Sequence, residues 1–142
     1  MALLSAEDIK RLEAKIDAVR QMTSADLRVA ITGPTWLGIN RKARKIFDEH
    51  HLASTPERNA VLVVVDPKSR EIAIYGDEGI SSRADDMFFD GVRDAIVGEF
   101  RAGRPADGLS LGIRLLGEEL VRLYPSNGQP RAGRQTDGII HA

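Results

Sequence analysis

The stretch Ala60-Val61-Leu62-Val63-Val64-Val65-Asp66 decides the fold, because it is almost wholly apolar and rich in β-branched residues. A strand of this composition is typical of the centre of a sheet whose two faces are both covered. The following segment, 67–70, is short and contains proline, and residues 71–75 alternate in polarity. We therefore predict that strands 60–66 and 71–75 form an antiparallel hairpin.

Helical and strand patterns alternate around this hairpin. Residues 26–32 (D-L-R-V-A-I-T) alternate like a strand, and apolar residues at helical spacing predict helices over 5–22, 39–50, 82–100 and 105–124. Ser5 with Asp8, and Ser82 with Asp85, resemble helix-capping pairs. A helix joins strands 26–32 and 60–66, so these strands should be parallel with a right-handed crossover. The sequence predicts an α/β fold, a three-layer α/β/α sandwich in which about four helices flank a small mixed sheet.

The domain is predicted to occupy residues 5–124, since 142 residues suit one domain. Residues 125–142 are polar, glycine-rich and aperiodic, which predicts a disordered tail. Gly108 and Gly112 lie on one face of the last helix, where we expect close backbone packing. Trp36 is expected to pack under its own loop, with a surface anchor for a partner as the alternative.

Composition excludes several classes of function. The formal net charge is −1 and aromatic residues make up 5% of the chain, which argues against nucleic-acid binding. There is no cysteine, so a thiolate zinc site and a cysteine nucleophile are excluded. No apolar run approaches the ~20 residues of a membrane span, and the first residues do not resemble a signal peptide. We therefore expect a cytoplasmic protein.

The predicted topology brings acidic loops to one edge of the sheet. Strands 26–32 and 60–66 begin there, and strand 71–75 ends there because it runs the other way. The loop Gly76-Asp77-Glu78-Gly79-Ile80 should therefore lie beside the two strand starts. Oxygen-bearing side chains expected at this edge are Asp77, Asp26, Glu78, Asn59 and Asp85. Such oxygens suit a hard divalent cation, Ca²⁺ or Mg²⁺, with Asp77 as the first candidate ligand.

Simpler interpretations of the same residues stay open. An acidic residue at a helix start stabilises the helix dipole, which alone could explain Asp85. Asp77 and Glu78 could form a plain turn between two glycines. The general rule for open α/β sheets favours the opposite edge, with Gly33 and Asp66. The basic run 41–45 is expected to be a solvated helix face, and His50 and His51 point about 100° apart on a helix, which disfavours a shared metal.

Three segments in order resemble the TPM domain family: T-S-A-D-L-R-V at 23–29, T-P-E-R-N-A-V-L at 55–62 and G-D-E-G-I at 76–80. The resemblance runs from about residue 5 to residue 124. It implies an α/β/α sandwich with an acidic cleft, in which some members bind Ca²⁺ and for which acid phosphatase activity has been proposed. The family's first segment commonly ends in Glu, where this chain has Asp26. Many relatives carry a signal peptide and a membrane anchor, neither of which is expected here.

Three hypotheses about function follow. The first is a divalent-cation-binding domain that uses the acidic edge. The second is a metal-assisted acid phosphatase, in which the cation polarises the phosphoryl group and Arg58 holds the phosphate. The third is a non-enzymatic protein-interaction or scaffold domain, with the basic face 41–45 as one possible contact surface.

Overall fold

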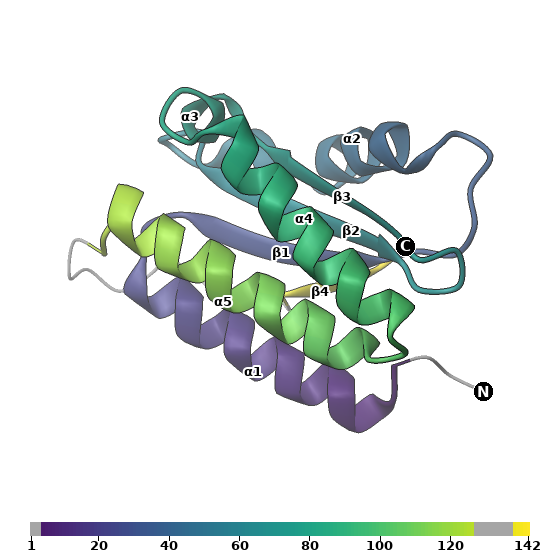
Figure 1. Ribbon diagram of the computed structural model, residues 1–142. Helices are drawn as coiled ribbons and strands as arrows, with labels where there is room; N and C mark the ends of the chain where they lie inside the picture. Colours follow the sequence, from purple (N-terminus) through teal and green to yellow (C-terminus); the bar gives the residue numbers. More distant parts are fainter. Residues whose placement is uncertain (1–3, 127–137) are drawn as a thin grey trace.

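The structure is a computed structural model that describes residues 4–126 and 138–142. These residues form a four-stranded sheet with the order β3-β2-β1-β4 (Figure 1). The strands are β1 (Asp26–Ile31), β2 (Ala60–Asp66), β3 (Glu71–Gly76) and β4 (Ile139–His141). As predicted, β1 and β2 are parallel and β2 and β3 form an antiparallel hairpin.

Helices cover both faces of the sheet. On one face α1 (Ala6–Met22), α5 (Pro105–Leu123) and α4 (Asp86–Arg101) lie side by side, with α5 between the other two (Figure 1). On the other face α2 (Ile39–Glu49) packs against β2 and β3. Two short elements, η1 (Leu52–Ser54) and α3 (Glu78–Ser81), complete the described chain. The predicted α/β/α sandwich is confirmed, and α3 is the helix that the sequence pattern did not predict.

The central strand β2 joins two hydrophobic clusters. All seven of its residues are buried. Val61, Val63 and Val65 pack toward α1, α4 and α5, whereas Leu62 and Val64 pack toward α2. Each fully buried aliphatic side chain contributes about 1.5–3 kcal/mol. The apolar stretch 60–66 therefore stabilises both layers at once, which is the reason it determines the fold.

The predicted start of the helix over 82–100, which is α4 in the structure, is wrong. The capping box of Ser5 and Asp8 at α1 is confirmed, but Ser82 does not cap α4. Ser82 ends α3, and its hydroxyl donates to the carbonyl of Gly79 at 3.0 Å. Asp85 caps α4 instead, by accepting from the backbone N–H of Met87 at 2.9 Å. The extra turn of α3 therefore moves the start of the long helix by several residues.

Glycines allow α4 and α5 to approach closely. A Cβ at Gly112 would lie 2.5 Å from Cδ1 of Ile96, and a Cβ at Gly108 would lie 3.0 Å from the carbonyl oxygen of Ile96. Both glycines are buried in α5. The predicted close packing is confirmed.

The predicted disordered tail is wrong for residues 139–141. These residues form β4, which pairs in parallel with β1, and Ile139 and Ile140 are buried. Gly138 precedes the strand, and a Cβ there would lie 2.5 Å from Cγ2 of Ile16. A strand of three residues is too short to show alternation in the sequence. Residues 127–137 lie outside the described residues, so the prediction is not tested there.

Trp36 does not pack under its loop, contrary to the expectation. Its side chain is 94% exposed. The loop is closed without it, because the hydroxyl of Thr35 accepts the backbone N–H of Leu37 at 3.2 Å. Within the described residues, no helix combines the length and apolarity that crossing a membrane requires.

Candidate functional site

The acidic loop lies where the strand directions place it. Asp26 pairs with Ala60 across β1 and β2, and Val61 pairs with Gly76 across β2 and β3. Beyond the hairpin, the backbone N–H of Asp77 donates to the carbonyl of Ala60 at 3.0 Å. Residues 76–80 therefore lie beside the start of β2, as predicted.

Gly79 allows α3 to lie directly on the loop before β2. Its N–H donates to the carbonyl of Arg58 at 2.8 Å. A Cβ at this position would lie 2.2 Å from the carbonyl oxygen of Glu57 and 2.7 Å from that of Arg58. The hydroxyl of Tyr124 donates to the carbonyl of Gly79 at 2.7 Å, from the far end of α5. Only glycine fits here, and the contact fixes Asp77 beside Arg58.

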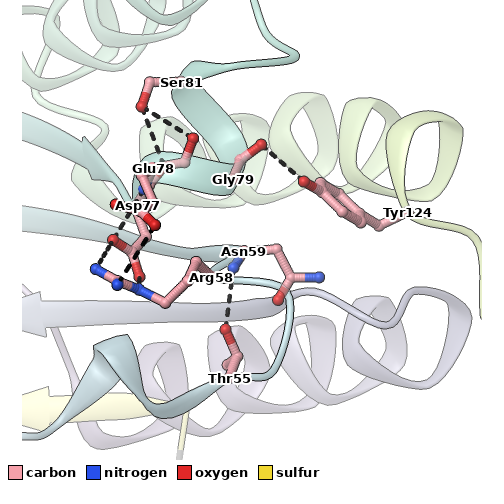
Figure 2. Close-up of polar contacts among 8 residues, drawn as sticks. All are labelled: Thr55, Arg58, Asn59, Asp77, Glu78, Gly79, Ser81 and Tyr124. Atoms are coloured by element: carbon pink, nitrogen blue, oxygen red, sulfur yellow. Dashed lines mark hydrogen bonds and ion pairs between the residues drawn. The ribbon is translucent and has the colours of Figure 1, made fainter.

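Arg58 and Asp77 form a bidentate ion pair at the centre of this edge (Figure 2). Nε of Arg58 donates to Oδ2 of Asp77 at 2.6 Å, and Nη2 donates to Oδ1 at 2.8 Å. Charge-assisted pairs of this fork geometry are the strong class of hydrogen bond. The Asp77 side chain is only 4% exposed, whereas that of Arg58 is 42% exposed. The Asp77 carboxylate is thus buried, and the guanidinium of Arg58 contacts it from the solvent side.

The backbone on both sides supports this pair. Arg58 has φ 51°, in the left-handed region that a non-glycine residue adopts uncommonly. Asp77 caps α3, and its Oδ1 accepts the N–H of Glu78 at 2.8 Å. The side chain of Glu78 is mostly exposed, and its Oε1 lies 3.5 Å from Nη1 of Arg58. One guanidinium therefore faces two carboxylates.

The pKa of Asp77 reflects these contacts. Burial on its own would raise the pKa, but the hydrogen bonds from Arg58 and from the backbone of Glu78, together with the charge of Arg58, outweigh burial and lower it. The same hydrogen bond to Asp77 raises the pKa of Arg58. Both partners are therefore charged at neutral pH.

Asp26 belongs to a separate ion cluster. Its carboxylate lies 3.2 Å from Nε of Arg28 and 3.3 Å from Nε of Arg20. Asp26 and Arg20 are both buried. Two guanidinium groups therefore neutralise the residue that was predicted to join Asp77 around a cation.

Asn59 turns its side chain away from the Arg58–Asp77 pair (Figure 2). Its backbone N–H donates to the hydroxyl of Thr55 at 3.0 Å, and its Nδ2 lies 3.5 Å from the hydroxyl of Ser24. The side chain is buried, and within the described residues its Oδ1 has no hydrogen-bond partner. Asn59 is therefore near the acidic loop along the chain, but it does not face Asp77.

The predicted ligands share the edge without forming a preformed cage. Asp85 caps α4, which confirms the helix-start interpretation of that residue. Asp77 and Glu78 face Arg58, and Asp26 faces Arg28 and Arg20. Across residues 4–126 and 138–142, no group of three or more His, Asp or Glu side chains is placed to hold a metal ion. In this arrangement the carboxylates of Asp26, Asp77 and Glu78 contact guanidinium groups. A metal ion would have to displace a guanidinium group in order to bind them.

Sequence reasoning missed the arginine partners of Asp26. Asp26 and Arg28 are two apart in a strand, so they lie on the same face, and that spacing was a usable signal. Arg20 lies in α1 and gives no such signal.

The fold and this edge define a small α/β/α domain whose acidic loop is closed by an internal ion pair. The chain belongs to the TPM domain family, because the model of the TPM domain matches residues 1–119. This confirms the resemblance noted in the sequence. A comparison with curated proteins finds no match.

Solved structures share the fold. The chain is similar to the BA42 protein of the psychrophilic bacterium Bizionia argentinensis, with 27% identity and a TM-score of 0.88 over 98% of this chain and 95% of that one. The N-terminal domain of the cg2496 protein of Corynebacterium glutamicum has 15% identity and a TM-score of 0.65 over 94% and 84%. An N-terminal domain from P. gingivalis has 18% identity and a TM-score of 0.68 over 90% and 84%. The last two support the fold alone.

Proposed function

We propose that this TPM domain binds a divalent cation, Ca²⁺ or Mg²⁺, at Asp77 and Glu78 in competition with the guanidinium of Arg58. The observation that carries the proposal is the bidentate pair. The buried, oriented carboxylate of Asp77 is held by the side chain of Arg58, which is 42% exposed. A carboxylate oxygen is a preferred ligand of hard cations. The backbone N–H of Glu78 already orients Asp77, so its direction does not depend on Arg58 alone.

Competition makes the affinity depend on Arg58 in a defined direction. A cation must displace the guanidinium from both oxygens of Asp77, so removal of the guanidinium should strengthen cation binding. Ion pairs with an exposed partner contribute little net stability, so we expect a gain in affinity of several-fold at most. Asp26 and Asn59 take no part in this version of the site, because they face other groups.

Titration with CaCl₂ and with MgCl₂, followed by thermal unfolding, tests the proposal on Arg58→Gln and Asp77→Asn. Ligand at 100 times its Kd adds ~2.7 kcal/mol to stability, which raises the Tm of a domain of this size by several degrees. We expect Arg58→Gln to bind more tightly than the wild type, and Asp77→Asn to lose the response. Arg93→Gln is the matched control, because Arg93 forms exposed ion pairs with Asp90 and Asp94 on α4.

Two results would contradict the proposal. One is the absence of a Tm response to either cation in both the wild type and Arg58→Gln. The other is a response that survives Asp77→Asn. The phosphatase hypothesis assigns a phosphate to Arg58, whose Nε and Nη2 donors are engaged by Asp77. A phosphate at Arg58 would therefore have to displace Asp77, just as a cation at Asp77 would have to displace Arg58.

The exposed Trp36 favours partner binding as a second candidate function. Large aromatic side chains are enriched at the centres of protein interfaces. Trp36→Ser should leave the Tm unchanged, because the side chain is 94% exposed. A partner whose binding survives this substitution would rule out Trp36 as its anchor.

A further inference from the structure

A second site candidate lies at the opposite edge of the sheet. A cleft of about 710 Å³ is formed there by the carboxyl ends of the parallel strands β1, β2 and β4 together with Leu4 and the N-terminal part of α1. Sites for small molecules have volumes of about 300–1,000 Å³. Its apolar wall includes Leu4, Ile9 and Ile31, and its basic side includes Lys68, Arg70 and His141.

The topology of the sheet favours a ligand at this position. The chain leaves β1 through α2 on one face to reach β2, whereas α4 and α5, which precede β4, lie on the other face. In open α/β sheets, ligands bind outside the carboxyl ends of the parallel strands, and β1, β2 and β4 all end at this edge. The cleft lies at these carboxyl ends, on the edge away from Arg58 and Asp77.

The charge of the cleft is unbalanced toward the positive. Among the described residues, no ion pair involves Lys68, Arg70 or His141. The acidic residue of the lining is Asp66, whose Oδ1 accepts the backbone N–H groups of Lys68 and Ser69 at 3.1 and 3.2 Å. Asp66 thus holds the hairpin turn, and the two basic side chains of that turn are left for solvent or a ligand.

The backbone of the turn supports the same interpretation. Arg70 has φ 58°, a left-handed conformation that glycine or asparagine adopts far more readily. A bulky side chain at such a position is more common at functional sites than elsewhere. Together with Lys68 two residues before it, Arg70 gives the cleft two cationic donors on one short turn.

We propose that this cleft binds a small organic anion, a phosphate monoester or carboxylate that carries an apolar group. Lys68, Arg70 and His141 bind the anionic end, because ammonium, guanidinium and imidazole groups donate hydrogen bonds to such oxygens. Leu4, Ile9 and Ile31 contact the apolar end. This site is separate from the proposed cation site, so either proposal can fail without the other.

NMR titration of the ¹⁵N-labelled chain with phenyl phosphate tests this site. We expect amide shifts at Thr32, Gly33 and Ser69, and none at Gly76 or Gly79. Inorganic phosphate and phenol each supply one half of the proposed ligand, and each should bind at least about tenfold more weakly than phenyl phosphate. Equal binding of inorganic phosphate would overturn the apolar half of the proposal. Shifts centred on residues 76–80 would overturn the location.

Substitutions then test whether the basic side chains of the cleft contribute to binding. Lys68→Gln with Arg70→Asn removes both cations and keeps a residue that tolerates the left-handed backbone. It should weaken phenyl phosphate binding by about tenfold or more. Arg44→Gln with Lys45→Gln removes the same charge from the exposed side of α2 and is the matched control. Equal weakening in both double variants would show a general charge effect and overturn the site.

Gly33→Leu provides a second, steric test. A Cβ at Gly33 meets no atom within 4 Å, and the residue lines the cleft. A leucine there adds volume at the cleft without a clash at Cβ. It should therefore weaken the binding of phenyl phosphate, although the basic side chains of the cleft remain. Unchanged affinity in both Gly33→Leu and the Lys68/Arg70 variant would refute the proposal. No phenyl phosphate binding at millimolar concentration in the wild type would refute it as well.

Discussion

Replacement of Gly79 by alanine should destabilise the domain more than any ordinary glycine substitution in a helix. The added Cβ would lie 2.2 Å from the carbonyl oxygen of Glu57, and ordinary contact begins at 3.4 Å. The atoms must therefore separate by about 3.4 − 2.2 = 1.2 Å. Both neighbours are backbone, so no flexible side chain can yield.

The size of the effect follows from what that movement disrupts. Overpacking costs about 1–3 kcal/mol. The hydrogen bonds that Gly79 shares with Arg58 and Tyr124 are worth about 1 kcal/mol each. The better helix propensity of alanine returns up to about 1 kcal/mol. The expected loss is about 3 kcal/mol, or roughly 10 °C in Tm for a domain of this length.

Urea unfolding followed by far-UV circular dichroism measures this loss. Gly91→Ala is the matched control, because Gly91 lies on the exposed side of α4 and a Cβ there meets no atom within 4 Å. That control should gain up to about 1 kcal/mol. If Gly79→Ala lost less than about 0.5 kcal/mol, the size of an ordinary surface effect, α3 would not be packed against the loop as described.

Three further predictions concern Asp77, Tyr124 and the strand β4. Because the folded pKa of Asp77 is lowered, its charge contributes stability that is present above the unfolded pKa of about 3.9 and is lost as pH falls through the folded pKa. Asp77→Asn should therefore flatten the dependence of Tm on pH below about pH 5, and an unchanged slope would contradict the pairing. Tyr124→Phe should lose about 1 kcal/mol in urea unfolding, since only the hydrogen bond to Gly79 is removed and Arg83 still lies 4.5 Å over the ring. Removal of residues 127–142 deletes β4 with its buried Ile139 and Ile140, which should lower the free energy of unfolding by about 3–6 kcal/mol. A Tm within a few degrees of the wild type would show that β4 is dispensable.

The sequence predicts the sheet centre well, because its signals are local. The run 60–66 is apolar on both faces, and the short turn after it permits a hairpin, so the β2–β3 pair follows from neighbouring residues. The strand β4 cannot be found this way. Its three residues pair with Val29, Ala30 and Ile31 of β1 through the tertiary fold, and no local pattern marks them.

The sequence predicts where the candidate site lies, but it does not predict the ion pair between Arg58 and Asp77. Strand direction alone brought Arg58 and Asp77 to one edge. Their pairing depends on the hairpin register, in which Val61 faces Gly76 and the next residues outward approach each other. Spacing in the sequence does not contain that register, so Arg58 was assigned to a phosphate and Asp77 to a cation. The structure pairs Arg58 with Asp77, and the assignments of these residues to a phosphate and to a cation stay predictions.

The pairing of β4 with β1 joins two strands that are synthesised at different times. Val29 and Ile139 are 139 − 29 = 110 residues apart, so the ribosome makes β1 long before the strand that covers its free side. An uncovered strand edge is a template for pairing with another chain. Contacts this distant in sequence also form slowly. During synthesis, β1 therefore passes through an interval in which aggregation competes with closure, and a chaperone that binds extended segments would act in that interval.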